Sequence, residues 1–268
     1  MRVKSPLLTG ILLCCCLYCS AQTWELGVFG GGAGYMGDLN PVKPYKLNNL
    51  AFGGMIQYNF NAIWGLKLGI THGKIQAADS LSDNAQYRQR NLSFYSPITE
   101  ASLQLVFNFF EYVPSMSRKI YTPYLFVGVG GVFFNPKTRM DGREYELRYL
   151  GTEGQSVENP YRNYTLTVPY GLGIKYNIAG KWSLSGEIGY RTAYTDYLDD
   201  VSGRYPTADL LSTAPQLTAI RKKLSDPSVN HIGAPLTQRG DFRKRDTYFF
   251  TVIGITYTFV TQKCPVVN

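Results

Sequence analysis

The residues from Leu166 to Tyr194 alternate between apolar and polar side chains twice in succession. Even positions from Leu166 to Ile178 are mainly apolar, the short segment Ala179-Gly180-Lys181 interrupts them, and the alternation restarts at Trp182. Successive side chains of a strand point to opposite faces, so this pattern predicts a hairpin with one apolar and one polar face. Each strand has about a dozen residues, which exceeds the usual five or six of soluble strands. A tilted strand of that length can cross a bilayer, and we therefore expect a transmembrane β-barrel.

The N-terminal residues, Met1 to Ala21, have the features of a secretory signal peptide. Basic residues come first, a short apolar run follows, and Cys19-Ser20-Ala21 provides small side chains before the predicted cleavage at Gln22. No Leu-(Ala/Ser)-(Gly/Ala) triplet precedes a cysteine, so we do not expect lipidation. The predicted domains are residues 1–21 as signal peptide and 22–268 as one barrel, in which Cys264 is the remaining cysteine.

The charge balance bears on the partners of the chain. The net charge is +8, and it falls to +6 when the two basic residues of the predicted signal peptide are removed. An exported chain rarely meets nucleic acid, so the basic residues indicate either solvated loops without a partner or contact with anionic lipopolysaccharide and lipid headgroups. No nucleic-acid partner is predicted.

The same alternation identifies six further strands and gives eight in total, an even number typical of bacterial barrels. The predicted strands are Trp24 to Gly34, Ala51 to Asn61, Leu66 to Gln76, Pro97 to Phe109, Tyr124 to Asn135, Leu166 to Ile178, Trp182 to Tyr194 and Thr247 to Phe259. The faces of the fifth strand cannot be assigned, because it is apolar and glycine-rich on both sides. Within the residues from Ala208 to Leu224, spaced leucines predict short helices broken near Pro215.

Short and long connections alternate strictly between these strands. The short ones lie between Asn61 and Gly65, between Phe110 and Pro123, and between Ala179 and Lys181. The four long connections therefore share one side. In outer-membrane barrels that side is the exterior, so we expect an outer-membrane location with both termini in the periplasm.

The polar faces of the predicted strands place charged side chains of both signs inside the barrel. An eight-stranded barrel is narrow enough for side chains to fill it, so internal ion pairs are expected to replace an aqueous channel. The predicted interior charges are Glu25, Lys67, Glu100, Lys175, Glu187 and Arg191.

The longest connection has acidic residues at one end and basic residues at the other. Three carboxylates on a loop could bind Ca²⁺, but we favour ion pairs across the loop. This predicted ion-pair cluster contains Asp196, Asp199, Asp200, Arg243, Lys244 and Arg245.

No catalytic, cofactor or metal site is predicted. His72 and His231 are the two histidines, which is too few for a multi-histidine metal site. Some outer-membrane barrels are lipid hydrolases with a Ser–His–acid arrangement, and Asp79 and Ser80 follow His72 in the chain. The parity of its strand, however, places His72 on the lipid side, and no nucleophile motif surrounds Ser80.

Several short motifs go beyond a generic barrel, and together they resemble the PorG family of the type IX secretion system of Bacteroidota. The motifs are Gly37-Asp38-Leu39-Asn40, Tyr58-Asn59-Phe60-Asn61, Arg90-Asn91-Leu92-Ser93-Phe94, Asn108-Phe109-Phe110, Thr122-Pro123-Tyr124-Leu125-Phe126, Phe134-Asn135-Pro136-Lys137, Leu150-Gly151-Thr152-Glu153-Gly154-Gln155 and Thr195-Asp196-Tyr197-Leu198-Asp199-Asp200-Val201-Ser202.

The resemblance implies a non-enzymatic outer-membrane component that serves export of cargo with a C-terminal sorting domain. It also implies association with the periplasmic ring of PorK and PorN. If so, the longest short-side turn, with Arg118 and Lys119, is our candidate docking segment. Two alternatives remain: an OmpA-type structural or adhesive barrel, and a lipid-modifying enzyme.

Overall fold

The computed structural model describes residues 23–41, 43, 45–212 and 214–260. The predicted signal peptide and Cys264 lie outside these residues. No helix within the described ranges is both long and apolar enough to cross a bilayer.

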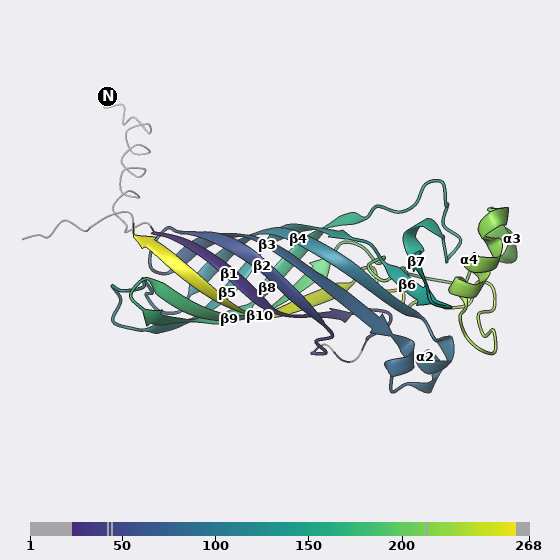
Figure 1. Ribbon diagram of the computed structural model, residues 1–268, viewed down its shortest axis with the longest axis horizontal. Coiled ribbons are helices and arrows are strands. Elements are labelled where there is room, and N and C mark those ends of the chain that lie inside the picture. The colour runs from purple at the N-terminus through teal and green to yellow at the C-terminus, as the bar shows by residue number, and fades with distance from the viewer. Residues whose placement is uncertain (1–22, 42, 44, 213, 261–268) are drawn as a thin grey trace, which may run out of the picture.

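Eight long antiparallel strands form a closed barrel, which confirms the predicted fold class (Figure 1). Each long strand pairs with its neighbour in the chain, and the first pairs with the last from Thr23 opposite Val260 to Met36 opposite Thr247, which closes the barrel. The strands are β1 (Thr23–Met36), β2 (Asn49–Asn59), β3 (Trp64–Ala78), β4 (Ser93–Asn108), β5 (Tyr121–Phe134), β8 (Tyr164–Ala179), β9 (Trp182–Ala193) and β10 (Thr247–Val260).

Five of the strands, β1, β2, β3, β4 and β8, extend further toward the long loops than the sequence predicts. β3 continues to Ala78 and β4 begins at Ser93, and these two residues are paired. The apolar alternation reports only the part of a strand whose outer face meets hydrocarbon, whereas backbone pairing continues beyond it. The predicted boundaries therefore mark the apolar belt better than the strand ends.

Among the described residues, the long connections carry all the remaining elements, and these lie beyond one end of the barrel (Figure 1). They are η2 (Asp79–Leu81), α2 (Ala85–Arg90), the hairpin of β6 (Lys137–Met140) and β7 (Arg143–Glu146), η3 (Leu147–Tyr149), α3 (Ala208–Ser212), η4 (Pro215–Leu217) and α4 (Thr218–Ser225). The last three match the predicted broken helices. We call the long connections and their elements the loop cap. The other end has the three short turns, and the paired residues Thr23 and Val260 lie there.

The outer wall exposes a belt of large apolar side chains. Leu172 and Ile188, which are paired across β8 and β9, are 57% and 46% exposed, while their chain neighbours Gly173 and Gly189 on the opposite parity are buried. Aromatic pairs edge the belt on the turn side, where Trp24 packs on Tyr58. The further pairs there are Trp64 with Phe107 and Trp182 with Tyr257. An apolar band bordered by aromatic rings is the exterior of a transmembrane barrel.

We expect Leu172→Arg to lower the free energy of unfolding by about 2–4 kcal/mol, because Leu172 lies near the middle of β8 and a charge there must enter hydrocarbon. Urea unfolding of the protein refolded into lipid vesicles measures this. Val229→Arg is the control: Val229 is 89% exposed in the loop cap, so its replacement should change stability by about 0.5 kcal/mol or less. Equal losses in both variants would contradict a lipid-facing β8.

The structure also assigns the faces of β5. Leu125, Val127 and Val129 are exposed, whereas Tyr124 and Phe126 are buried in the barrel. The ring of Phe126 occupies space left by one glycine of β8 and one of β9, since a Cβ on Gly171 or Gly189 would come within 2.7 or 2.6 Å of its Cζ. Aromatic residues fill the interior here, which is why this strand is apolar on both faces.

Candidate functional site

The barrel interior contains all six charges that the polar faces predicted, and they form ion pairs. Lys175 Nζ lies 2.9 Å from Glu25 Oε2, and both side chains are 3% exposed. Lys67 Nζ lies 2.5 Å from Glu187 Oε2. Arg191 Nε lies 3.4 Å from Glu100 Oε2, and a second nitrogen of Arg191 lies 4.0 Å from Glu187.

Neutral groups complete this network and leave little free space. Tyr124 donates to Glu187 at 2.9 Å, Tyr248 donates to Glu100 at 2.5 Å, and Asn59 donates to Glu25 at 2.8 Å. The cavity among these side chains has a volume of about 40 Å³, which is close to the space of one water molecule. The interior therefore acts as a packed core and not as a channel.

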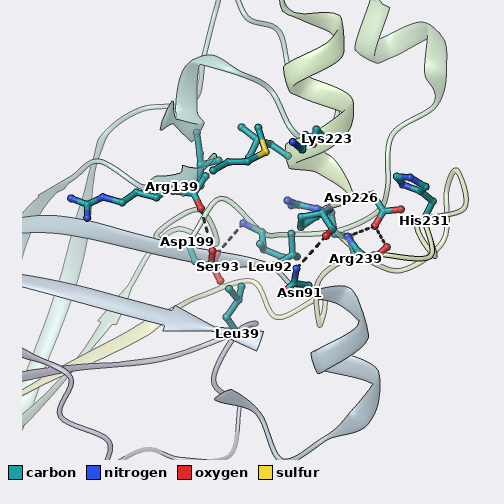
Figure 2. A pocket seen from close by; sticks show the side chains of 17 residues that line it. Leu39, Asn91, Leu92, Ser93, Arg139, Asp199, Lys223, Asp226, His231 and Arg239 are labelled. Carbon is teal, nitrogen blue, oxygen red and sulfur yellow. Dashed lines mark hydrogen bonds between the residues drawn. The ribbon is translucent and has the colours of Figure 1, made fainter. Parts of the chain in front are cut away.

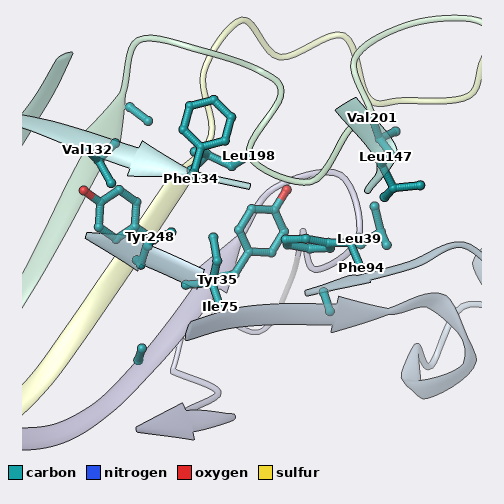
Figure 3. Close-up of a cluster of buried hydrophobic side chains, with 14 of the residues drawn as sticks. Tyr35, Leu39, Ile75, Phe94, Val132, Phe134, Leu147, Leu198, Val201 and Tyr248 are labelled. Carbon is teal, nitrogen blue, oxygen red and sulfur yellow. The ribbon is translucent and has the colours of Figure 1, made fainter. Parts of the chain in front are cut away.

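Above these ion pairs, an apolar cluster fills the barrel end below the loop cap (Figure 3). Strand residues Tyr35, Ile75 and Phe94 meet Leu198 and Val201 of the longest loop. The ring of Tyr35 packs edge-on against Phe94 with centroids 4.9 Å apart. The loop cap is thereby attached to the barrel by a hydrophobic core of its own.

The short turn between β4 and β5 displays the two predicted docking residues. Arg118 and Lys119 are both exposed, and Lys119 Nζ lies 3.5 Å from the centroid of the Phe110 ring. The base of the turn is anchored, because buried Tyr112 lies 2.6 Å from Ser183 of β9 through their hydroxyl oxygens. The turn thus presents cations on a fixed base.

The residues considered for lipid hydrolysis do not meet. His72 is exposed on the outer wall, and its Nδ1 lies 2.9 Å from the hydroxyl of Thr99. Asp79 is buried in the loop cap, where it is paired with Arg90. A Ser–His–acid arrangement is therefore not formed by these residues.

The predicted ion-pair cluster of the longest loop is wrong in its partners. Arg243 pairs with Asp241 at 3.0 Å, and the guanidinium of Arg245 lies over the Tyr194 ring at 4.1 Å. Lys244 is exposed. The three carboxylates turn into the loop cap instead, because Asp199 and Asp200 are almost completely buried there.

Asp196, Asp199 and Asp200 have separate surroundings in the loop cap. Asp200 accepts hydrogen bonds from Thr152 and Tyr161, and burial raises its pKa to about 6. Burial likewise raises the pKa of Asp196 to about 6. Burial and the neighbouring carboxylates raise the pKa of Asp199 well above its ordinary value.

Two arginines that sequence reasoning missed connect the long loops. Arg90, at the end of α2, donates from Nε and Nη2 to the two carboxylate oxygens of Asp79 at 2.7 and 2.8 Å. It also donates to the backbone carbonyls of Arg239 and Asp38 at 2.5 and 3.0 Å. Arg239 in turn donates to Glu153 Oε1 and to the carbonyl of Asp200, both at 2.9 Å. Four long loops thus meet at two buried guanidinium groups.

A cavity of about 400 Å³ lies within the loop cap next to these arginines (Figure 2). Its wall combines polar residues from separate loops: Asn91, Arg139, Lys223, Asp226, His231 and Arg239. We assign this cavity no ligand.

Some of the sequence motifs contain the charged residues that meet in the loop cap. The motifs that carry the family resemblance include Asp38, Arg90, Glu153 and Asp200, and the structure brings these residues together in the loop cap. Their positions in one long-loop assembly explain why such motifs lie in the connections as well as in the strands.

Comparison with known protein families identifies the family of this chain. Residues 4–215 match the family described as "Domain of unknown function (DUF6089)". The chain belongs to this family. No curated protein matches this DUF6089 member.

Solved structures with a similar trace are bacterial outer-membrane proteins. A major outer membrane protein from Thermus thermophilus is 13% identical with a TM-score of 0.43, over 89% of this chain and 100% of the other. The N-terminal β-barrel domain of Pseudomonas aeruginosa OprF is 12% identical with a TM-score of 0.39, over 90% and 98%. OprG from the same organism is 13% identical with a TM-score of 0.40, over 90% and 96%. The assignment of the fold rests on the strand pairing described above and not on these distant similarities.

Proposed function

We propose that this DUF6089 protein is a non-enzymatic outer-membrane barrel of the type IX protein secretion system. In this role it anchors the periplasmic PorK and PorN ring for export of cargo with a sorting domain. The motifs that resemble the PorG family suggest the system, and the apolar belt with its aromatic borders supports a location in the outer membrane. The proposed orientation puts the short turns and both chain ends in the periplasm.

The packed interior is the observation on which the anchoring role rests. Ion pairs and tyrosines leave a cavity of about 40 Å³, so cargo cannot pass through this barrel. A barrel that does not conduct the cargo acts through its surfaces, and on the short-turn side the anchored turn with Arg118 and Lys119 offers a positively charged one. Complementary charge across an interface favours association.

We expect the double variant Arg118→Glu/Lys119→Glu to lose ring co-purification by about tenfold or more, because like charges would face each other at the interface. Secretion of sorting-domain cargo should fall with it. The matched control is Arg143→Glu/Lys222→Glu, which reverses two exposed charges in the loop cap and should leave both readouts unchanged. Normal co-purification in the turn variant would remove the docking role of this turn.

An OmpA-type adhesive barrel is the second candidate, and the elaborate loop cap favours it. Exposed Val229, Leu236 and Phe242 could contact surfaces outside the cell. A deletion strain separates the functions. Lost secretion supports the export role, lost attachment supports adhesion, and altered lipid A would indicate a lipid-modifying enzyme.

A further inference from the structure

Three carboxylates from separate parts of the chain meet at the loop end of the barrel. Asp38 follows β1, Asp199 lies in the longest loop, and Asp246 immediately precedes β10. One oxygen from each lies within 4.8 Å of the others. Each of the three residues is only 1% exposed, so bulk water cannot screen their charges.

Backbone amides and one hydroxyl satisfy most of the carboxylate oxygens. Val201 donates to Asp199 Oδ1 at 2.9 Å, and Leu198 donates to Asp246 Oδ2 at 3.0 Å. The Tyr35 hydroxyl lies 2.6 Å from Asp199 Oδ2 and 2.9 Å from Asp246 Oδ1. A hydroxyl has one proton, so it can donate to only one of these two oxygens at a time.

Asp38 provides an independent sign that a ligand belongs here. Its Oδ1 accepts from the amide of Asp241, whereas its Oδ2 is buried and has no hydrogen-bond partner among the described residues. A buried carboxylate oxygen without a partner is costly, and a buried charge is normally paired or bound to a metal. The cluster therefore lacks one positive group.

Arg90, which contacts Asp38, does not supply that group. The guanidinium of Arg90 already pairs with both oxygens of Asp79, and its contact with Asp38 is to the backbone carbonyl.

We propose that Asp38, Asp199 and Asp246 bind one Ca²⁺ ion, which ties the first long loop to both ends of the longest one. Carboxylate oxygens are hard ligands, and Ca²⁺ binds them at about 2.3–2.6 Å in irregular geometry. Opposite ligands of such an ion are about 4.6–5.2 Å apart, so oxygens within 4.8 Å of one another can share it. This inference is independent of the proposed secretion role.

The test uses the mature protein refolded in detergent and treated with a chelator. Calorimetric titration with CaCl₂ should show one bound ion for each chain. Hydrogen exchange of Leu198 and Val201 should slow about 100-fold when free Ca²⁺ is 100 times Kd, because the ion binds only the closed loop. Asp38→Asn and Asp199→Asn should lose both responses, whereas Asp83→Asn, a change at an exposed aspartate outside the cluster, should keep them.

Two results would overturn the proposal. The first is a wild-type protein that neither binds Ca²⁺ nor changes its exchange at about 10 mM, which is above the range of weak extracellular calcium sites. The second is an equal response to Mg²⁺, which would contradict the assignment to Ca²⁺. The wild-type titration needs no variant, so it decides the question even if an Asn substitution disturbs the loops.

Discussion

Replacing Lys175 with Met is expected to lower the free energy of unfolding of the barrel by about 3–5 kcal/mol. Lys175 and Glu25 are each 3% exposed, and their charged atoms are 2.9 Å apart. Without the ammonium group, the Glu25 carboxylate keeps only the Asn59 amide as its polar partner among the interactions described above. Urea unfolding in detergent micelles, followed by tryptophan fluorescence, measures the loss.

The companion double variant separates a lost ion pair from lost packing. Glu25→Leu/Lys175→Met removes both charges, and apolar replacement of a buried pair is often neutral or stabilising, so most of the stability should return. Glu158→Gln, an exposed change in the loop cap, is the control and should differ from the native protein by about 0.5 kcal/mol or less. A double variant as unstable as Lys175→Met would show that volume matters here and charge does not.

The second large effect is expected in the loop cap. Arg90→Ala should destabilise the closed cap by about 3–5 kcal/mol, because Asp79 would remain buried without its cation and two backbone carbonyls would lose their donor. The barrel strands make none of these contacts and should keep their stability. Limited proteolysis of the long loops measures opening of the cap, and heat-dependent gel mobility reports the state of the barrel.

Arg88→Ala gives the matched control on the same helix. Arg88 donates only to carbonyls of Ser82 and Asp83 in exposed positions, so its loss should leave the protease resistance of the loops nearly unchanged. If both arginine variants are cleaved equally fast, Arg90 does not hold the cap together.

The barrel could be predicted from the sequence because the bilayer imposes a simple period on it. Leu172 must face lipid and Lys175 must face inward. A shift of the strand register by one residue would move each of these side chains to the opposite face of the barrel wall. The alternation fails in β5, where Phe126 fills the interior against two glycines and both faces become apolar. The glycines of other strands determine that face, so β5 alone does not contain the information.

The loop cap could be predicted only in outline. Acidic and basic residues at the two ends of the longest loop suggested ion pairs with each other, but the Asp200 carboxylate accepts from Thr152 and Tyr161 instead. The Asp199 carboxylate accepts from Tyr35. These partners are far apart in the sequence and follow no period. Only the folded loops determine which of many charges become buried together.

Spin-label accessibility along β8 in lipid bilayers tests the central claim, that the apolar faces of eight strands contact hydrocarbon. Single cysteines at positions 166–178, introduced with Cys264 replaced by Ser, would carry the labels. The structure predicts that labels at Leu166, Leu172 and Ile174 collide with dissolved oxygen, while labels at the odd-numbered positions of the same stretch are shielded from oxygen and from a polar relaxation agent. Equal access of the polar agent to both faces, or no alternation at all, would contradict the barrel's insertion in a membrane.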